Sequence, residues 1–252
     1  MDSILSYIGG KSLLADKIIP RIPEHRAYVE VFAGAAWLLF KKEPSRVEII
    51  NDVNSELITL YRCIKEHLDE LVRYFRWLLT SRDEFERFKA IDPATMTDIQ
   101  RAVRFYYLLR NSFSSKMDWN SWRVSATQGP SFNILRIEEQ LSNAHIRLSR
   151  VYIENRPYQN ILTRFDKPDT FFYCDPPYFG CENDYGKDLF SPDDFLTLRD
   201  LLAALEGKFI LSLNDVPEVR EIYRDFKILK VKTRYSVGGS NKAVSEVLIS
   251  NY

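Results

Sequence analysis

A short aromatic run followed by Asp175, two prolines and Tyr178, at residues 171–178, constrains the fold of this chain more than any other stretch. Its β-favouring and aromatic residues predict a buried strand. The strand has to stop at Pro176 and Pro177, because proline donates no ladder hydrogen bond and fixes φ. Asp175 is therefore held at the carboxyl end of a strand, which is the edge of an open α/β sheet where ligands bind.

The residues at this strand end present acceptors beside a ring. We expect the carboxylate of Asp175 and the carbonyl of Pro176 to accept hydrogen bonds, and Tyr178 follows two residues later. An acceptor pair next to a flat ring suits a planar substrate that carries an amino group, such as a nucleobase. The alternative is an ordinary junction between a strand and a turn, because Asp-Pro and Pro-Tyr are common in turns.

Length and composition indicate a globular α/β protein. The 252 residues suffice for a full core, in one large domain or in one domain with an insertion. No apolar run approaches the ~20 residues that cross a bilayer, and the N-terminus lacks a signal-peptide layout. We therefore expect no membrane contact. The three cysteines and three histidines show no metal-ligand spacing, so we expect no metal site. Because the three cysteines do not indicate a disulfide framework, we expect a reducing, cytoplasmic setting.

Positive charge is concentrated in the middle of the chain, although the net charge is zero. Residues 101–150 carry 8 Lys and Arg against 3 Asp and Glu, and both flanking parts carry more acids than bases. Seven aromatic residues are interleaved with this excess. A basic segment with side chains that can stack is typical of nucleic-acid contact, whereas charge alone would be explained by a solvated helix face.

Two strand-and-turn units near the N-terminus predict a cofactor site. Residues 27–36 form a strand and a small-residue turn, followed by a helix from 37 to 42, and a second strand at 47–50 leads to Asp52. Asp52 lies 22 residues after Glu30, close to the ~20-residue interval at which an acidic residue meets ribose hydroxyls. With one glycine where a dinucleotide site has three, the pattern favours an adenosine ligand without a pyrophosphate, and S-adenosylmethionine fits.

Residues 55–150 lack the alternation of strands and helices that surrounds them. A helical pattern runs from residue 56 to about 107, with a break at Asp92-Pro93, and a further helix is expected at 137–148. Alternation returns afterwards, with a helix that starts after Ser191, a strand at 208–214 and two final strands. We therefore expect residues 55–150 to be an insertion between the strands of one sheet.

Together these stretches resemble the Dam-type DNA adenine N6-methyltransferases, the group with its target-recognition insertion between the cofactor motifs and the catalytic motif. The resemblance covers nearly the whole chain and rests on the order and spacing of residues 9–11, 30–35, 51–54, 175–178 and 245–252. It implies an α/β, Rossmann-like methyltransferase sheet with helices on both faces. Residues 1–54 and 151–252 would form the S-adenosylmethionine-binding catalytic domain, and residues 55–150 a mainly helical, inserted target-recognition domain.

The resemblance also implies the site residues. The catalytic residues would be Asp175, Pro176, Pro177 and Tyr178, which would grip and stack on a flipped-out adenine in double-stranded DNA. The cofactor pocket would be lined by Tyr7, Gly9, Lys11, Glu30, Phe32, Gly34, Asp52, Asn155 and Asp175. DNA would be contacted by Arg110, Asn111, Ser112, Phe113, Lys116, Arg123 and Asn133. No metal and no obligate protein partner are implied.

Two departures from the family pattern bear on the cofactor, and three alternatives remain. Ala35-Ala36 stands where the family often has a second glycine, and Pro157 stands where relatives usually place an acidic residue near the cofactor's adenine. An N4-cytosine methyltransferase, an RNA adenine methyltransferase and an inactive DNA-binding relative stay open at this point. The recognition sequence, whether GATC or another, and a companion restriction enzyme are not specified by the sequence.

Overall fold

A computed structural model gives the fold of the chain and describes residues 3–5, 12–112, 119, 122–124, 127, 129, 132–182, 190–237 and 240–252. Seven strands form one sheet in the order β3-β2-β1-β4-β5-β7-β6. Neighbouring strands are parallel from β3 to β5, and β7 is antiparallel to both β5 and β6. The strands are β1 (Ala27–Glu30), β2 (Val47–Asn51), β3 (Val151–Glu154), β4 (Thr170–Cys174), β5 (Lys208–Asn214), β6 (Lys227–Val237) and β7 (Ser240–Ser250).

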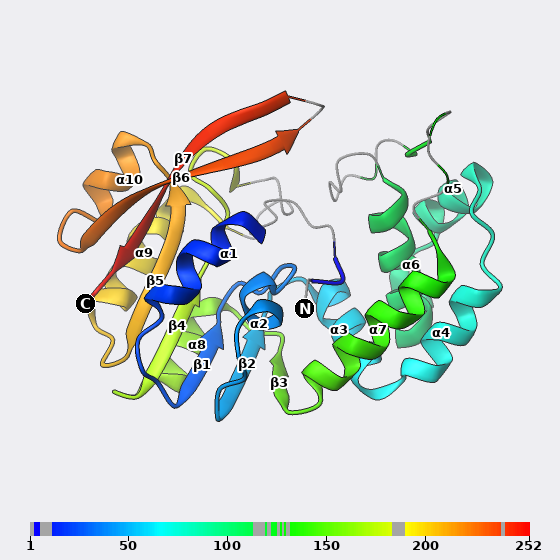
Figure 1. The fold of residues 1–252 in the computed structure, drawn as a ribbon, viewed down its shortest axis with the longest axis horizontal. Helices are drawn as coiled ribbons and strands as arrows, with labels where there is room; N and C mark the ends of the chain where they lie inside the picture. Colours follow the sequence, from blue (N-terminus) through cyan, green and yellow to red (C-terminus); the bar gives the residue numbers. More distant parts are fainter. Residues whose placement is uncertain are drawn as a thin grey trace.

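Helices lie on both faces of the sheet (Figure 1). The helices are α1 (Ser12–Ile18), α2 (Trp37–Lys41), α3 (Ser55–Glu66), α4 (Leu68–Arg76), α5 (Arg82–Ala90), α6 (Asp98–Asn111), α7 (Ile134–Leu148), α8 (Tyr158–Phe165), α9 (Pro192–Ala203) and α10 (Pro217–Ile222), with 3-10 turns at Ile19–Arg21 and Pro93–Thr95. The predicted α/β sheet, helical on both faces, is confirmed.

The two faces follow from the alternation of side chains along each strand. In β4, Phe171 and Tyr173 join a buried cluster with α1, α2, α3, α6 and α7, whereas Phe172 and Cys174 join a second cluster with α8, α9 and α10. Because successive strand residues point to opposite faces, a central strand covered on both sides is apolar at nearly every position. This is why residues 171–174 form one continuous hydrophobic run.

Most expected element ends are where the sequence placed them. Asn54 caps α3 by accepting hydrogen bonds from the amides of Glu56 and Leu57, and Ser191 forms a capping box with Asp194 at the start of α9. The helical pattern from 56 to 107 is more divided than expected. His67, with φ −135° and ψ 40°, separates α3 from α4, and Ser81 starts α5 as an N-cap.

The segment 55–150 shares its buried core with one face of the sheet. The cluster on that face runs from β1, β2 and β4 through α3 and α6 to α7. Arg147 of α7 also donates hydrogen bonds to Glu48 of β2, which is paired with Lys42 at 2.6 Å. The inserted domain and its boundaries at 54/55 and 150/151 stay predictions, and the segment itself is joined to the sheet by both packing and charge.

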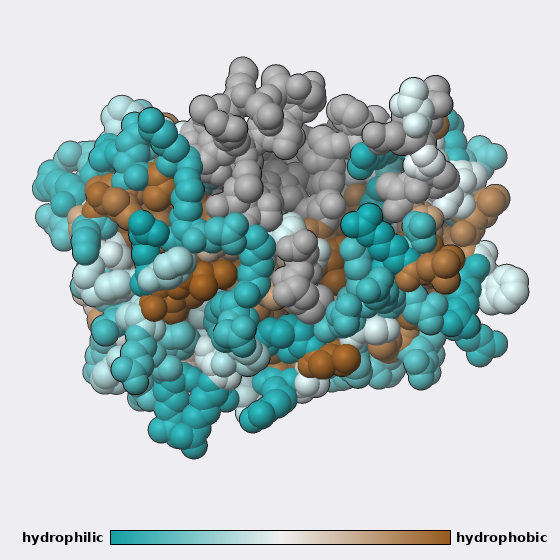
Figure 2. Space-filling model, viewed as in Figure 1, coloured by the Kyte–Doolittle hydropathy of each residue, from teal (hydrophilic) through white to brown (hydrophobic). Residues whose placement is uncertain are grey.

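The surface seen in Figure 2 is hydrophilic over most of the described helices and carries separate hydrophobic patches. Among the described residues of segment 55–150, five large apolar side chains are highly exposed: Trp77, Leu79, Val124, Leu135 and Ile146. Within the described ranges, no helix combines the length and hydrophobicity needed to cross a membrane. The same residues hold no cluster of three or more His, Cys, Asp or Glu side chains suited to a metal ion.

Candidate active site

The strand order brings three predicted carboxylates to one edge of the sheet. β1 lies between β2 and β4, so Glu30 at the end of β1 stands between Asp52, just beyond β2, and Asp175, just beyond β4. The pairing continues past the strands, because the amide of Val31 donates to the carbonyl of Tyr173 at 2.9 Å. Residues that are 145 positions apart in the sequence therefore lie at the same carboxyl edge of the sheet, which is where ligands bind in open α/β sheets.

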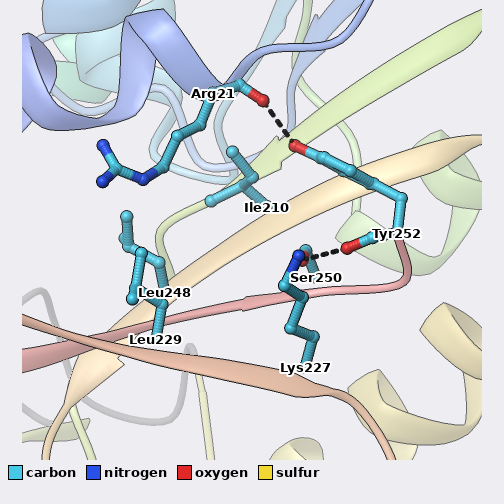
Figure 3. Close-up of a pocket in the computed structure, with 7 residues that line it drawn as sticks. All are labelled: Arg21, Ile210, Lys227, Leu229, Leu248, Ser250 and Tyr252. Carbon is cyan, nitrogen blue, oxygen red and sulfur yellow. Dashed lines mark hydrogen bonds between the residues drawn. The ribbon is translucent and has the colours of Figure 1, made fainter.

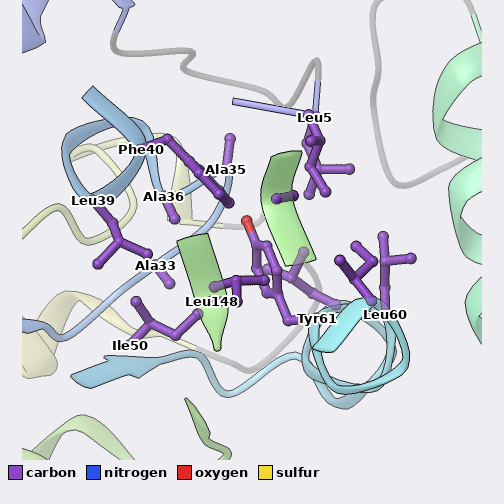
Figure 4. Packing of buried hydrophobic residues seen from close by; sticks show 14 of the residues in the cluster. Leu5, Ala33, Ala35, Ala36, Leu39, Phe40, Ile50, Leu60, Tyr61 and Leu148 are labelled. Atoms are coloured by element: carbon purple, nitrogen blue, oxygen red, sulfur yellow. The ribbon is translucent and has the colours of Figure 1, made fainter. Parts of the chain in front are cut away.

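A tight turn follows β1 and forms the floor of the predicted cofactor site. Gly34 and Ala36 both adopt the left-handed region, with φ of 47° and 49°. The amide of Gly34 donates to Asp52 Oδ2 at 2.9 Å, and its carbonyl accepts from the hydroxyl of Tyr61 at 2.8 Å. Figure 4 shows the Tyr61 hydroxyl pointing from α3 toward this turn. The turn is thus held from β2 on one side and from the insertion on the other.

Asp52 and its neighbours connect the ends of three strands. Asp52 Oδ1 accepts from the amide of Asn54 at 2.9 Å, and burial raises the pKa of the Asp52 carboxyl. Asn155 donates to the carbonyls of Asp52 and Val53, at 2.7 and 3.1 Å. The amide of Asn155 therefore positions the loop after β2, and its direct contact with a cofactor stays a prediction.

The buried residue Asn51 is a connector that the sequence interpretation did not assign. Its side-chain amide donates to the carbonyls of Val31 and Arg156, both at 3.0 Å, and its oxygen accepts from the amide of Arg156 at 2.9 Å. The ends of β1, β2 and β3 are therefore fixed relative to one another. An asparagine at a strand end next to an acidic residue was the available signal.

Glu30 is an acid in an apolar setting. Its side chain is 1% exposed, and Oε2 accepts from the Tyr28 hydroxyl and from the Leu39 amide, both at 3.2 Å. The pKa of Glu30 is raised to about 8, chiefly by burial and in part by the charge of Asp175, against the lowering effect of those two donors. Next to it, the half-buried ring of Phe32 packs against Tyr158 at a centroid distance of 5.5 Å.

The predicted catalytic carboxylate is held by the neighbouring strand. Ser212 of β5 donates to Asp175 Oδ1 at 2.8 Å, and the Tyr173 hydroxyl lies 3.0 Å from Ser212 Oγ. Asn214, at the end of β5, accepts from the amide of Phe179 and donates to its carbonyl, both at 3.0 Å. The loop after Asp175 is therefore fixed by side chains of the strand predicted at 208–214, to which the sequence assigned no role in the site.

The rest of this loop is compact. Pro176 is buried, and Pro177 and Tyr178 are half-buried. The chain then reverses in a turn in which the amide of Cys181 donates to the carbonyl of Tyr178 at 2.8 Å. Gly180 occupies the third position of that turn with φ 82°, which only glycine adopts without strain.

The predicted DNA-contact residues gather at the end of α6, where several side chains already have partners. Arg110 donates to the Tyr106 hydroxyl and to Gln140, and the buried Asn111 donates to the carbonyl of Tyr107. Ser112 is buried and its backbone forms an isolated bridge with Trp122. Their roles in DNA contact stay predictions.

Two further predicted DNA contacts are exposed, Arg123 and Asn133. Arg123 is anchored by its backbone, whose amide donates to the carbonyl of Asn111 at 2.7 Å. Asn133 caps α7 by accepting from the amide of Arg136 at 3.3 Å. Five predicted site residues lie outside the described part of the chain: Tyr7, Gly9, Lys11, Phe113 and Lys116.

A shallow pocket of about 180 Å³ lies away from these residues (Figure 3). Its apolar floor is made by Ile210, Leu229 and Leu248, and the Tyr252 hydroxyl donates to the carbonyl of Arg21 at its rim. The pocket sits where β6 begins and β7 ends, toward the edge of the sheet at which the parallel strands start. None of the predicted site residues lines it.

Comparison with known proteins decides the family. Residues 7–237 match the model of the D12 class N6 adenine-specific DNA methyltransferases. The chain belongs to this family. A type II methyltransferase of Lactococcus lactis subsp. cremoris, M1.LlaDCHI, is 28% identical over 98% of this chain and 94% of its own length. The DNA adenine methylase of Escherichia coli K12 is also 28% identical, over 98% and 94% of the two chains.

Membership confirms the activity that the sequence analysis predicted. This D12 class chain is a DNA adenine N6-methyltransferase, and the family implies a methyl donor of the S-adenosylmethionine type. A more distant relative, the type II methyltransferase M.CviBI of Paramecium bursaria Chlorella virus NC1A, is 21% identical over 93% of this chain and 91% of its own length. The chain therefore spans nearly the full length of the relatives it matches.

Proposed function

We propose that this D12 methyltransferase moves the methyl group of S-adenosylmethionine to the amino group of an adenine rotated out of double-stranded DNA, with Asp175 as the catalytic carboxylate. The observation that carries the proposal is the fixed position of Asp175 at the carboxyl edge, beside Glu30 and Asp52. A carboxylate held there can accept a hydrogen bond from a substrate amine.

The residues at the edge fit the proposed cofactor. S-adenosylmethionine has an ammonium group and ribose hydroxyls, and the edge offers carboxyl groups at Glu30 and Asp52. Gly34 leaves space because it has no side chain, and its backbone is clamped by Asp52 and Tyr61. We propose that Asp52 meets the ribose, Glu30 the methionine end, and Phe32 the apolar part of the pocket, with Asn155 holding the loop after β2.

The chemistry asks little of the protein beyond placement and electrostatics. The cofactor supplies a methyl group on a sulfonium, which is already a good electrophile. The amino group of adenine is a weak nucleophile, because its lone pair is delocalised into the ring. Hydrogen bonds to the Asp175 carboxylate and the Pro176 carbonyl would localise that lone pair and stabilise the positive charge that develops, and loss of one such group typically costs about 3–4 kcal/mol.

The substrate base has to leave the duplex before it can reach Asp175. Rotating a base out of the duplex costs a few kcal/mol, and stacking of the base on an aromatic ring offsets about 1–3 kcal/mol of this cost. Tyr178, two residues after Pro176, is the ring that we assign to this contact. The basic segment 101–150, with Arg110 and Arg123, would contact phosphates, which position the protein without specifying a sequence.

The test is Asp175→Ala, with methyl transfer measured as N6-methyladenine formed in duplex DNA from labelled S-adenosylmethionine. We expect transfer to fall by several hundredfold or more while the Kd for the cofactor, by calorimetry, changes little. Asp200→Ala is the matched control, because that carboxylate lies on α9 and is 67% exposed. Retained transfer in Asp175→Ala, or an equal loss of transfer in the control, would contradict the assignment.

The placement of DNA has its own test. Arg110→Ala and Arg123→Ala are expected to weaken duplex binding and to reduce the dependence of log Kd on log salt concentration by up to about one unit each. Fluorescence anisotropy at several salt concentrations measures this slope. An unchanged slope in both variants would place the DNA on another surface.

A further inference from the structure

Three polar side chains form a chain of hydrogen bonds that leads from the core to the active-site edge. Tyr173 is 2% exposed and Ser212 is fully buried, and they belong to neighbouring strands β4 and β5. Their oxygens are 3.0 Å apart, and Ser212 Oγ is 2.8 Å from Asp175 Oδ1. The series of hydrogen bonds therefore ends at the Asp175 carboxylate, which the proposed function uses.

The direction of this chain is fixed by the number of protons available. Ser212 Oγ lies 2.8 Å from Asp175 Oδ1 and 3.5 Å from the Cys174 carbonyl, so we assign its single proton to the much shorter contact with the carboxylate, which only accepts. The Tyr173 hydroxyl must then donate to Ser212. Burial, followed by the charge of Asp175, raises the pKa of Tyr173 well above its ordinary value, so Tyr173 keeps its proton and remains a donor. Each hydroxyl thus orders the next one, ending at Oδ1.

Ser212 is unusual for its place in the sheet. It lies in the middle of β5, where its neighbours Phe209, Ile210, Leu211 and Leu213 are all buried and apolar. An unpaired buried hydroxyl is costly in such a place, whereas alanine or valine would pack there without a polar group. Apolar packing therefore does not explain the serine, whereas its short hydrogen bonds with Asp175 and Tyr173 do.

A carboxylate just beyond the end of a strand needs such a contact. Asp175 is followed by Pro176, which has no amide hydrogen to continue the ladder, and the side chain of Asp175 extends from the last residue before the prolines. The next strand supplies the restraint, since Cys174 is paired with Leu211 and Ser212 is one residue further on. Reacting groups have to be held to well under an ångström, and a 1 Å displacement can cost roughly a hundredfold in rate.

We propose that Ser212 is a positioning residue, oriented by the Tyr173 hydroxyl, that fixes the Asp175 carboxylate for adenine N6-methylation. The proposal rests on the proposed function of Asp175. It assigns to the core of the sheet a part in the reaction: two side chains that do not touch the substrate set the orientation of the one that does. Asn214 has a different task on the same strand, because it holds the backbone of Phe179.

The experiment compares Ser212→Ala, Tyr173→Phe and their double variant in steady-state methylation of duplex DNA. We expect kcat to fall roughly 10- to 100-fold in Ser212→Ala, with the KM values for DNA and cofactor changed by less than about threefold. Tyr173→Phe should lower kcat by a smaller factor. In the double variant, loss of the tyrosine hydroxyl should have little further effect, because Ser212 is the group through which it acts.

Tyr223→Phe is the matched control for removing a buried tyrosine hydroxyl. Tyr223 is fully buried, and its hydroxyl donates to the carbonyl of Phe195 on the other face of the sheet. We expect wild-type kcat in this variant, with at most a comparable loss in Tm. Tm and cofactor Kd are measured for every variant, so that a misfolded protein is recognised.

The possible results separate the two proposals. Wild-type kcat in folded Ser212→Ala, or effects of Ser212→Ala and Tyr173→Phe that multiply in the double variant, would overturn the positioning role. A loss of kcat in Tyr223→Phe equal to that in Tyr173→Phe would also overturn it, because stability alone would then explain the change. Retained transfer in Asp175→Ala would instead overturn the catalytic assignment on which the inference rests.

Discussion

Ala36 occupies a backbone conformation that glycine adopts more easily, and this allows a quantitative test of the turn after β1. Its φ and ψ are 49° and 41°, in the left-handed region. Alanine in this region costs about 1–2 kcal/mol, because its Cβ crowds the following carbonyl oxygen. The neighbouring Ala35 is also buried, at 6% exposure against 0% for Ala36, but its φ is not positive. The two alanines form a matched pair.

Replacing each alanine by glycine separates the strain from the other terms. Both replacements lose one buried methyl group, worth about 0.8 kcal/mol, and both give the unfolded chain about 0.5–1 kcal/mol of extra conformational freedom. Ala35→Gly should therefore lower the free energy of unfolding by about 1.3–1.8 kcal/mol. Ala36→Gly relieves the strain as well, so its stability should stay within about 1 kcal/mol of the wild type.

The measured quantity is the difference between the two variants in urea unfolding, followed by circular dichroism. We expect Ala36→Gly to be more stable than Ala35→Gly by about 1–2 kcal/mol, which equals the strain at position 36. Equal losses in the two variants would refute the reasoning. In that case the left-handed alanine would carry no strain, and the absence of a second glycine in this turn would have no structural consequence.

Two further predictions concern buried charge. Burial raises the pKa of Glu30 from 4.5 to about 8, so the folded protein binds more protons than the unfolded chain between these pH values. The contribution of the Glu30 proton to the unfolding free energy is therefore fully present below pH 4.5 and is lost as pH rises through 8. Glu30→Gln should flatten the fall in unfolding free energy between pH 5.5 and 7.5 by up to about 1.4 kcal/mol per pH unit, and parallel pH profiles would contradict this. Glu48→Gln leaves the buried Lys42 and the half-buried Arg147 without their anion and should cost about 3–5 kcal/mol of unfolding free energy. The control is Glu138→Gln at an exposed ion pair, where less than about 1 kcal/mol is expected, and equal losses would show that the Glu48 network is no stronger than a surface contact.

Several structural features of the candidate site could be predicted because their signals are local. The run at 171–174 had to be a covered central strand, and Pro176 and Pro177 had to end it. The turn after β1 was visible in its small residues, and Asp52 in its distance from Glu30. These features depend on backbone geometry and side-chain alternation, which act over a few residues.

Other contacts could not be predicted because they join residues that are distant in sequence. Ser212 is 37 positions from Asp175, and Tyr61 is 27 positions from the Gly34 carbonyl that it contacts. The position of β7 between β5 and β6 in the sheet was also not predicted. A hydroxyl in a strand has no partner until the neighbouring strand and its register are known.

The sequence by itself determined most of the strands and helices, where β4 ends, and that acidic side chains stand at or just beyond the ends of three strands, because short-range sterics and hydrophobic alternation decide these features. The tertiary structure alone decided which of those side chains meet, and it placed Tyr173, Ser212 and Asp175 in one chain of hydrogen bonds. Strand order and register are set by the packing of the whole sheet against helices from both ends of the sequence. A hydrogen bond that spans two strands exists only once that packing is complete.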